Sequence, residues 1–313
     1  MQEINHNYNS NITEDEIDLL ELFRILLDGK WIILSITSIS SIAVVIYSLM
    51  LPNIFESKSI LVSTDSFASG SISNTLSNYS GLASLAGINL PSQKSKSNSQ
   101  EAIMKINTLS FFKNNIMPYI FIPDLVALES WEKSTNTLYY NNDLYDKDSN
   151  KWINESEKPT AQESFRIFQE HFEIFEDKKN NFITLSIKHQ SPFIAKEWSD
   201  LLVKEINSFY RKKDKLESQK AVNYLNAQIS TTNLSEIKLV IAQLLQQETQ
   251  KLTLIEANES YVFEFIDPPA VMERKVEPRR ALICIIGALL GGVFSIIFVI
   301  IKYYFFRKGP VLS

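Results

Sequence analysis

Few side chains in this sequence have the types and spacing that catalysis or metal binding requires. Its three histidines are His6, in an Asn-rich N-terminal stretch, and His171 and His189, in or beside segments that alternate like β-strands. A lone histidine is more often a structural residue than a metal ligand, and no neighbouring residues complete the spacing of a zinc site. We therefore expect no metal and no cofactor.

The remaining candidates for chemistry are acidic residues and one basic run. A solvated surface explains Glu163, Glu170, Glu173 and Glu176 at least as well as paired acid–base catalysis does. The run at 211–220 has enough charge to attract an anionic glycan or lipid, although a solvated helix face is the simpler interpretation. Neither GxxxxGKS nor GxxxxGKT occurs, so the chain contains no P-loop ATPase or kinase. We expect a protein that is not an enzyme and has no nucleic-acid partner.

Two apolar segments, 31–51 and 281–301, each hold 21 residues and no charged side chain. About 20 apolar residues are enough for a helix to cross the hydrocarbon core of a membrane. The first segment contains several Ser and Thr residues, whose hydroxyls can bond to carbonyl oxygens one turn back. A cleaved signal peptide is the alternative for this segment, but thirty residues with seven acidic and two basic side chains precede it instead of a short basic leader. We predict two transmembrane helices, the first an uncleaved anchor.

The two spans define the remaining parts of the chain. They leave an N-terminal tail (1–30), a domain of about 230 residues (52–280) and a C-terminal tail (302–313), with both termini on one side of the membrane. Basic residues flank the spans on both sides, so the positive-inside rule does not orient the chain. Cys284, the single cysteine, lies in the second span, so we expect no disulfide in the domain.

Local patterns predict an α+β fold for the domain. Residues 15–30 have the spacing of an amphipathic helix that lies against the membrane and leads into the first span. Residues 66–100 are rich in Ser, Asn and Gly and favour a mobile loop, a helix is expected over 100–115, and 118–159 gives only weak signals. Alternation of apolar and polar residues predicts strands at 54–62, 172–177, 181–189 and 261–267, with a turn at 177–180.

A helical arm is predicted over about 192–257. Ser191 is a suitable helix cap and Pro192 a suitable first residue, and the 37 residues after it contain neither Gly nor Pro. At 1.5 Å per residue these span about 55 Å, which is too long to pack fully within a domain of this size, so the helix must project. A second helix follows, with Asn233 and Glu236 at the spacing of a capping box.

Two sets of residues are candidates for packing or partner contact. The first is the apolar stripe at the start of the arm, which we expect to be buried within the domain or against a neighbouring copy: Ile194, Trp198, Leu202 and Ile206. In the second span Gly287 and Gly291 form a GxxxG pattern beside Gly292, and small residues at this spacing let another helix approach closely.

Several segments in a fixed order resemble the bacterial polysaccharide co-polymerases, and in particular the O-antigen chain-length determinants. They are DEIDLLELFRILLDGKW from Asp15, GLASLAGINL from Gly81, LYDKDSNKW from Leu144, ITLSIKHQSPFIAKEWSDLLVKEINSFYR from Ile183, FEFIDPPAV from Phe263 and EPRRALICIIGALLGG from Glu277. Pro278 fits the later of the spaced prolines that the family carries before its second span. The earlier proline has no counterpart within 272–275.

The resemblance implies a specific function. It places the chain in the inner membrane of a Gram-negative bacterium, with both termini cytoplasmic and an α/β domain in the periplasm. It further implies a ring-shaped homo-oligomer that sets the modal length of glycans made by an O-antigen polymerase, with the glycan or its lipid-linked form as a further partner. The alternative is a capsule or exopolysaccharide export adaptor that works with a separate tyrosine kinase.

Overall fold

The structure is a computed structural model that describes residues 19–64 and 98–307. It separates into two compact units, one formed by 1–51 with 277–313 and the other by 52–276. Three predicted features lie outside the described residues: the start of the amphipathic helix at 15–18, the part of the Ser-, Asn- and Gly-rich loop at 66–97, which includes the apolar run at 81–90, and the last residues of the C-terminal tail.

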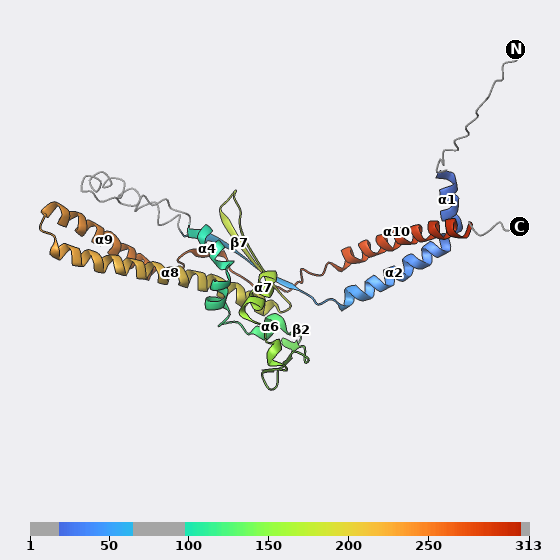
Figure 1. The fold of residues 1–313 in the computed structure, drawn as a ribbon, viewed down its shortest axis with the longest axis horizontal. Helices are drawn as coiled ribbons and strands as arrows, with labels where there is room; N and C mark the ends of the chain where they lie inside the picture. Colours follow the sequence, from blue (N-terminus) through green and yellow to red (C-terminus); the bar gives the residue numbers. More distant parts are fainter. Residues whose placement is uncertain (1–18, 65–97, 308–313) are drawn as a thin grey trace, which may run out of the picture. The chain divides into compact units, whose positions relative to one another are not determined.

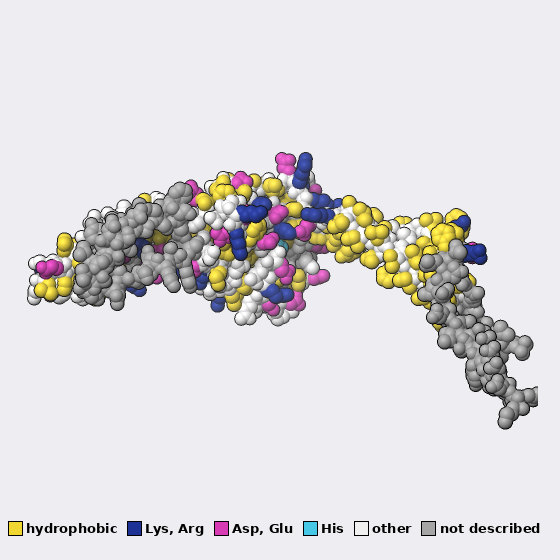
Figure 2. Space-filling model, turned by 90° about the horizontal axis from the view of Figure 1, so that it is seen from above, with side chains coloured by type: hydrophobic (Ala, Val, Ile, Leu, Met, Phe, Trp, Pro, Cys, Tyr) yellow, Lys and Arg dark blue, Asp and Glu magenta, His cyan; other side chains and the backbone are white. Residues whose placement is uncertain are grey.

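The membrane unit consists of three helices: α1 (Leu19–Asp28), α2 (Lys30–Met50) and α10 (Arg280–Arg307). Both α2 and α10 are long and apolar enough to cross a membrane. Apolar side chains cover most of their visible surface in Figure 2, as expected of helices that face lipid. α10 continues past the predicted boundary at Ile301 because the aromatic run that follows does not interrupt the helix.

A four-stranded antiparallel sheet forms the base of the second unit. Its strands are β1 (Phe55–Ser63), β6 (Phe172–Glu176), β7 (Phe182–His189) and β8 (Phe263–Asp267), in the order β6-β7-β1-β8. All four predicted strands are confirmed, as is the turn between β6 and β7. Asn181 ends that turn with a φ of 58°, a left-handed conformation that Asn tolerates well.

Helices cover one face of this sheet. α8 (Pro192–Thr231) packs on β1 and β7, and α7 (Ala161–His171) packs beside it on β7. Three short helices complete the layer: α4 (Asn98–Ile106), α5 (Leu109–Phe111) and the π-helix η1 (Phe112–Ile116). The core between sheet and helices includes the fully buried side chains of Leu61, Phe111, Phe168, Leu185 and Leu202.

A small satellite of short elements joins this base. It contains α6 (Ile122–Val126), the hairpin of β2 (Leu128–Glu132) and β3 (Thr137–Tyr140), the short pair β4 (Tyr145–Asp146) and β5 (Lys151–Trp152), and the 3₁₀ turn η2 (Glu155–Glu157). Its own core is aromatic, with the rings of Tyr140 and Tyr145 at 5.6 Å.

The helical arm is a hairpin of α8 and α9 (Ser235–Ala257), which lie side by side (Figure 1). α8 has 40 residues, a length of about 60 Å. Its first part belongs to the core of the base and its later part pairs with α9, where an ion pair joins Lys215 to Glu256. Where α8 ends, the hydroxyl of Thr232 donates to the Gln228 carbonyl (2.8 Å), which also accepts the Thr232 N–H (3.1 Å).

The predicted start of α8 is confirmed in position, with Ser191 at the N-cap and Pro192 as the first helical residue, but the capping bond of Ser191 and the predicted cap of α9 are wrong. Ser191 occupies the N-cap of α8, but its side chain makes no capping bond, and its backbone N–H donates to His189 Nδ1 (3.0 Å). Leu234, not Asn233, is the N-cap of α9. Only three residues separate α8 from α9, so Asn233 lies within the turn, one position too early to cap the helix.

The predicted helix over 100–115 is also wrong as a single element. It breaks after Ile106, and Thr108 starts α5 by accepting a hydrogen bond from the Phe111 N–H (3.3 Å). α7, which the sequence analysis did not predict, begins with a complete capping box between Thr160 and Glu163.

Candidate functional site

In the membrane unit, two glycines of α10 pack closely against α2. A Cβ atom added to Gly287 would lie 2.5 Å from Val44 Cγ2, and one added to Gly291 would lie 2.5 Å from Ser40 Oγ. Both distances are far below van der Waals contact, so only glycine fits at these two positions. The GxxxG pattern therefore packs on the chain's own first span.

The same face of α10 continues at four-residue intervals. The hydroxyl groups of Ser295 and Thr37 lie 3.3 Å apart across the two helices, and Ser295 is fully buried. Within α2, the Ser41 hydroxyl donates to the Thr37 carbonyl (2.8 Å), which confirms for this residue that the hydroxyls of the first span bond one turn back. Small and hydroxyl-bearing residues thus line the contact between the helices.

The two ends of this contact are also tied together. At one end the Arg280 guanidinium donates to the carbonyl oxygens of Ser48 (3.1 Å) and Leu51 (3.5 Å), acceptors that the end of α2 leaves free. At the other end Val299, which is buried, packs on Gly29 between α1 and α2. The sequence analysis missed this role of Arg280. A basic residue beside a membrane span was used only to infer the orientation of the span, and its hydrogen-bond partners in another segment could not be read from the sequence.

The other two candidates of this group lie apart from the helix contact. No atom of the described residues lies within 4 Å of a Cβ added to Gly292, so this position faces open space in the part of the chain that the structure describes. Pro278 precedes α10 and is half-buried; its carbonyl accepts a hydrogen bond from the Arg280 N–H (2.9 Å). The structure therefore brings Gly287 and Gly291 to α2, and leaves Gly292 available to a further helix.

The apolar stripe of α8 lies in the core of the base. The exposed fractions of its four residues are Ile194 7%, Trp198 3%, Leu202 1% and Ile206 0%. Trp198 contacts the rings of Phe168, His171 and His189, at centroid distances of 5.6, 6.1 and 4.9 Å. Since they are already buried within one chain, these side chains are not exposed for contact with a second copy.

The two strand histidines are structural in this arrangement. His189 is buried; its Nδ1 accepts the Ser191 N–H, so its Nε2 carries the proton and donates to the Asp124 carbonyl (3.0 Å). Burial, followed by the nearby charge of His171, lowers the pKa of His189 to about 4, which keeps the ring neutral near pH 7. Within 19–64 and 98–307, no group of three or more His, Cys, Asp or Glu side chains is arranged to hold a metal ion.

Three of the seven charged residues in the run of α8 at 211–220 contact other parts of the chain. Lys213 pairs with Glu101 (3.4 Å) and lies over the Tyr210 ring, and Lys215 pairs with Glu256. Asp214 accepts a hydrogen bond from the Tyr261 hydroxyl (2.6 Å). These contacts favour the interpretation of the run as a helix surface over that of a site for an anionic ligand.

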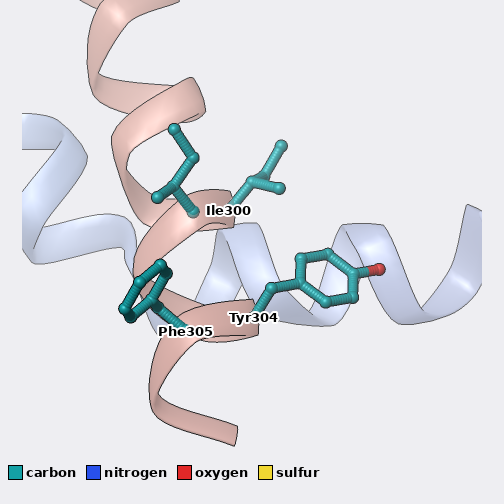
Figure 3. Close-up of a pocket in the computed structure, with 4 residues that line it drawn as sticks. Ile300, Tyr304 and Phe305 are labelled. Atoms are coloured by element: carbon teal, nitrogen blue, oxygen red, sulfur yellow. The ribbon is translucent and has the colours of Figure 1, made fainter. Parts of the chain in front are cut away.

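An open apolar pocket lies near the end of α10 and has a volume of about 500 Å³. It is lined by Ile300, Ile301, Tyr304 and Phe305. In Figure 3 Tyr304 and Phe305 point to different sides of the helix. All four residues belong to one helix and all are apolar or aromatic, which is the surface that a membrane helix presents to lipid near an interface.

Together, the α+β domain and the paired apolar helices have the arrangement of a two-pass membrane protein. Residues 15–109 match the family model of the chain length determinant protein, Wzz, and 235–304 match the G-rich domain found on putative tyrosine kinases. Over its first span and the start of its domain, the chain is therefore similar to the chain length determinant family.

The comparisons with individual proteins add little beyond this. No curated protein matches the chain significantly. A full-length bacterial polysaccharide co-polymerase is 14% identical with a TM-score of 0.43, over 94% of this chain and all of that one. A fragment of the polysaccharide co-polymerase WzzB from Salmonella Typhimurium is 15% identical with a TM-score of 0.29, over 72% of this chain and all of the fragment.

Proposed function

We propose that the protein sets the modal length of the O-antigen of lipopolysaccharide without catalysing a reaction itself. The observation that carries this proposal is the match of residues 15–109 to the chain length determinant model, which spans the first transmembrane helix and the start of the domain. An O-antigen polymerase in the same membrane is the enzyme on which it acts.

The topology that this function requires has both termini in the cytoplasm and residues 52–280 in the periplasm, across the bacterial inner membrane. The pairing of α2 with α10 as a hairpin supports it, because two packed spans return the chain to the side from which it started. In this topology 1–30 and 302–313 are the cytoplasmic tails.

A homo-oligomeric ring is the assembly that we propose for this role. A scaffold of several copies can hold a growing chain near the polymerase until termination becomes favoured, whereas a fixed competition between extension and termination produces a smooth fall-off in length. The open side of α10 at Gly292 is the part of the second span left for the polymerase, because its other small-residue face already packs on α2.

A deletion strain tests this function. We expect polymer synthesis to persist while the modal band of lipopolysaccharide disappears and chain lengths decline smoothly on a gel. An unchanged lipopolysaccharide ladder together with loss of capsule would contradict the proposal.

The second candidate is an adaptor for capsule or exopolysaccharide export that works with a separate tyrosine kinase. The match of residues 235–304 to a domain found on putative tyrosine kinases favours it. The same deletion separates the two candidates, because loss of an adaptor abolishes the surface polymer and leaves the ladder intact.

A further inference from the structure

An open groove of about 480 Å³ lies between α8 and the edge strand β8. Its apolar part is formed by Leu201 and Phe265, both half-buried, with the buried Phe263 behind them. No other aromatic ring in the described part of the chain stacks on Phe265. One aromatic ring is therefore free to contact a ligand.

Polar side chains without an internal role line the rim of this groove. In the part of the chain that the structure describes, no hydrogen bond or ion pair involves the side chains of Glu197, Lys204, Glu259 or Ser260. By contrast, the side chain of Asn207, which also lines the groove, makes three hydrogen bonds within the chain: it accepts the N–H groups of Val262 and Phe263 and donates to the Phe263 carbonyl. The wall of the groove is thus held in place by Asn207, whereas the polar side chains at its rim remain available to a ligand.

We propose that this groove binds a glycan chain composed of neutral or amino-bearing sugars. A pyranose ring has a C–H face that packs on an aromatic ring and a rim of hydroxyl groups that pair with carboxylates, hydroxyls and amines. A groove with an apolar floor and a few convergent polar groups provides both kinds of contact. The inference rests on the proposed function, because that function brings a growing polysaccharide to the domain.

The charges of the rim select the class of glycan. Glu197, Asp200 and Glu259 line the groove with one free lysine, Lys204, since Lys196 outside the groove pairs with Asp200 (2.7 Å). A polymer of acidic sugars would place its carboxylates near Glu197 and Glu259, which have no ion-pair partner among the described residues, and like charges at a binding surface are costly. Neutral hydroxyls and sugar amines meet no such repulsion.

A peptide strand added to the free edge of β8 is the competing occupant. Pro268 and Pro269 follow β8 directly and cannot donate to a strand ladder, so they limit such an extension. The unpaired groups of the rim are side chains, which suit sugar hydroxyls, whereas strand addition uses backbone groups.

Binding to the full chain in lipid nanodiscs tests the proposal. The probes are the O-polysaccharide released by mild acid from lipopolysaccharide of the producing strain, the capsular polysaccharide of that strain, and hyaluronan as a polymer of acidic repeats. Affinity is measured by calorimetry, and oligomer mass by light scattering on the same samples.

Three substitutions give the contrast. Phe265→Ala removes the aromatic floor and should weaken binding about three- to tenfold, the range that an aromatic contact contributes. Phe175→Ala is the control, because Phe175 is a strand phenylalanine that is 47% exposed and lies on β6, at the opposite edge of the sheet. Glu259→Gln should weaken binding of the neutral polymer by less than Phe265→Ala does, and should lessen the rejection of hyaluronan.

Each outcome decides the question. Binding of the O-polysaccharide that Phe265→Ala weakens and Phe175→Ala preserves supports the groove. Binding of the capsular polymer alone with the same pattern also supports it, and at the same time moves the protein to the export pathway. Absence of binding to both polymers, or equal loss in both phenylalanine variants, overturns the proposal. Loss of oligomer mass in Phe265→Ala with unchanged glycan affinity overturns it too, since the groove then holds a second copy.

Discussion

Gly291 of the second span lies directly against Ser40 of the first, so closely that a Cβ atom on Gly291 would lie 2.5 Å from Ser40 Oγ. Its neighbour Gly292 has nothing within 4 Å of the same added atom. Two adjacent glycines in one helix therefore have different surroundings, one occupied by the chain itself and the other open.

Leucine at these two positions should give different results. Gly291→Leu overpacks the contact with α2, which costs about 1–3 kcal/mol, and should lower the thermal stability of the purified protein in detergent. Gly292→Leu should leave that stability unchanged and shift or broaden the modal length of O-antigen, because the open side of α10 is the one proposed to meet the polymerase. Equal protein levels by immunoblot are the control. A normal ladder in the Gly292→Leu strain would contradict the proposed contact.

The sequence predicts this packing only in part. The spacing of Gly287 and Gly291 indicates that some helix approaches α10, but spacing alone does not say which helix. The answer depends on the positions of Val44 and Ser40 along α2, and the register between the two spans follows from Arg280 binding the end of α2. These are relations between segments more than 200 residues apart in the chain.

The structure of the large domain could also be predicted from the sequence only in part. Its four strands could be predicted because apolar residues alternate along each one, as in 182–189. The break at Thr108 and the helix that begins after Thr160 carried local signals that were not used, a hydroxyl beside Asn107 and a Thr-x-x-Glu capping box. The groove beside β8 could not be predicted, because it joins α8 to a strand more than 50 residues later.

Asn207→Ala should destabilise the domain strongly. Asn207 accepts two backbone N–H groups at the start of β8, at 2.8 and 2.9 Å, in a buried site. Its removal leaves buried donors without a partner, at a cost of about 1–3 kcal/mol for each group. Asn223→Ala is the control, because Asn223 is exposed on the same helix. Urea unfolding followed by tryptophan fluorescence measures both, and similar midpoints for the two variants would refute the role assigned to Asn207.

His189 should make the domain less stable in acid. The imidazole is neutral and buried with a pKa of about 4, below its ordinary value of 6.5, so the unfolded chain binds a proton more readily than the folded one does. The stabilising contribution is fully present above pH 6.5 and is lost as the pH falls towards 4, for a total of about 3 kcal/mol.

His189→Gln isolates this contribution from the titration of carboxylates. A Gln amide can still donate to the Asp124 carbonyl but has no proton to gain over this range. We expect the unfolding free energy of the wild type to fall more steeply between pH 6.5 and 4.5 than that of the variant. Parallel curves for the two proteins would show that His189 does not carry the effect.

The topology makes a prediction that single cysteines can test. In a Cys284→Ser background, Ser156→Cys places a thiol at an exposed position in the 3₁₀ turn of the domain, and Ser10→Cys places one in the N-terminal tail. A membrane-impermeant maleimide should label Ser156→Cys in intact cells with a permeabilised outer membrane, because the domain is proposed to lie in the periplasm. It should label Ser10→Cys only after the inner membrane is opened, and this second step is the control for reactivity of that thiol. The opposite labelling pattern would place the domain in the cytoplasm, where neither a periplasmic glycan nor its polymerase could contact it.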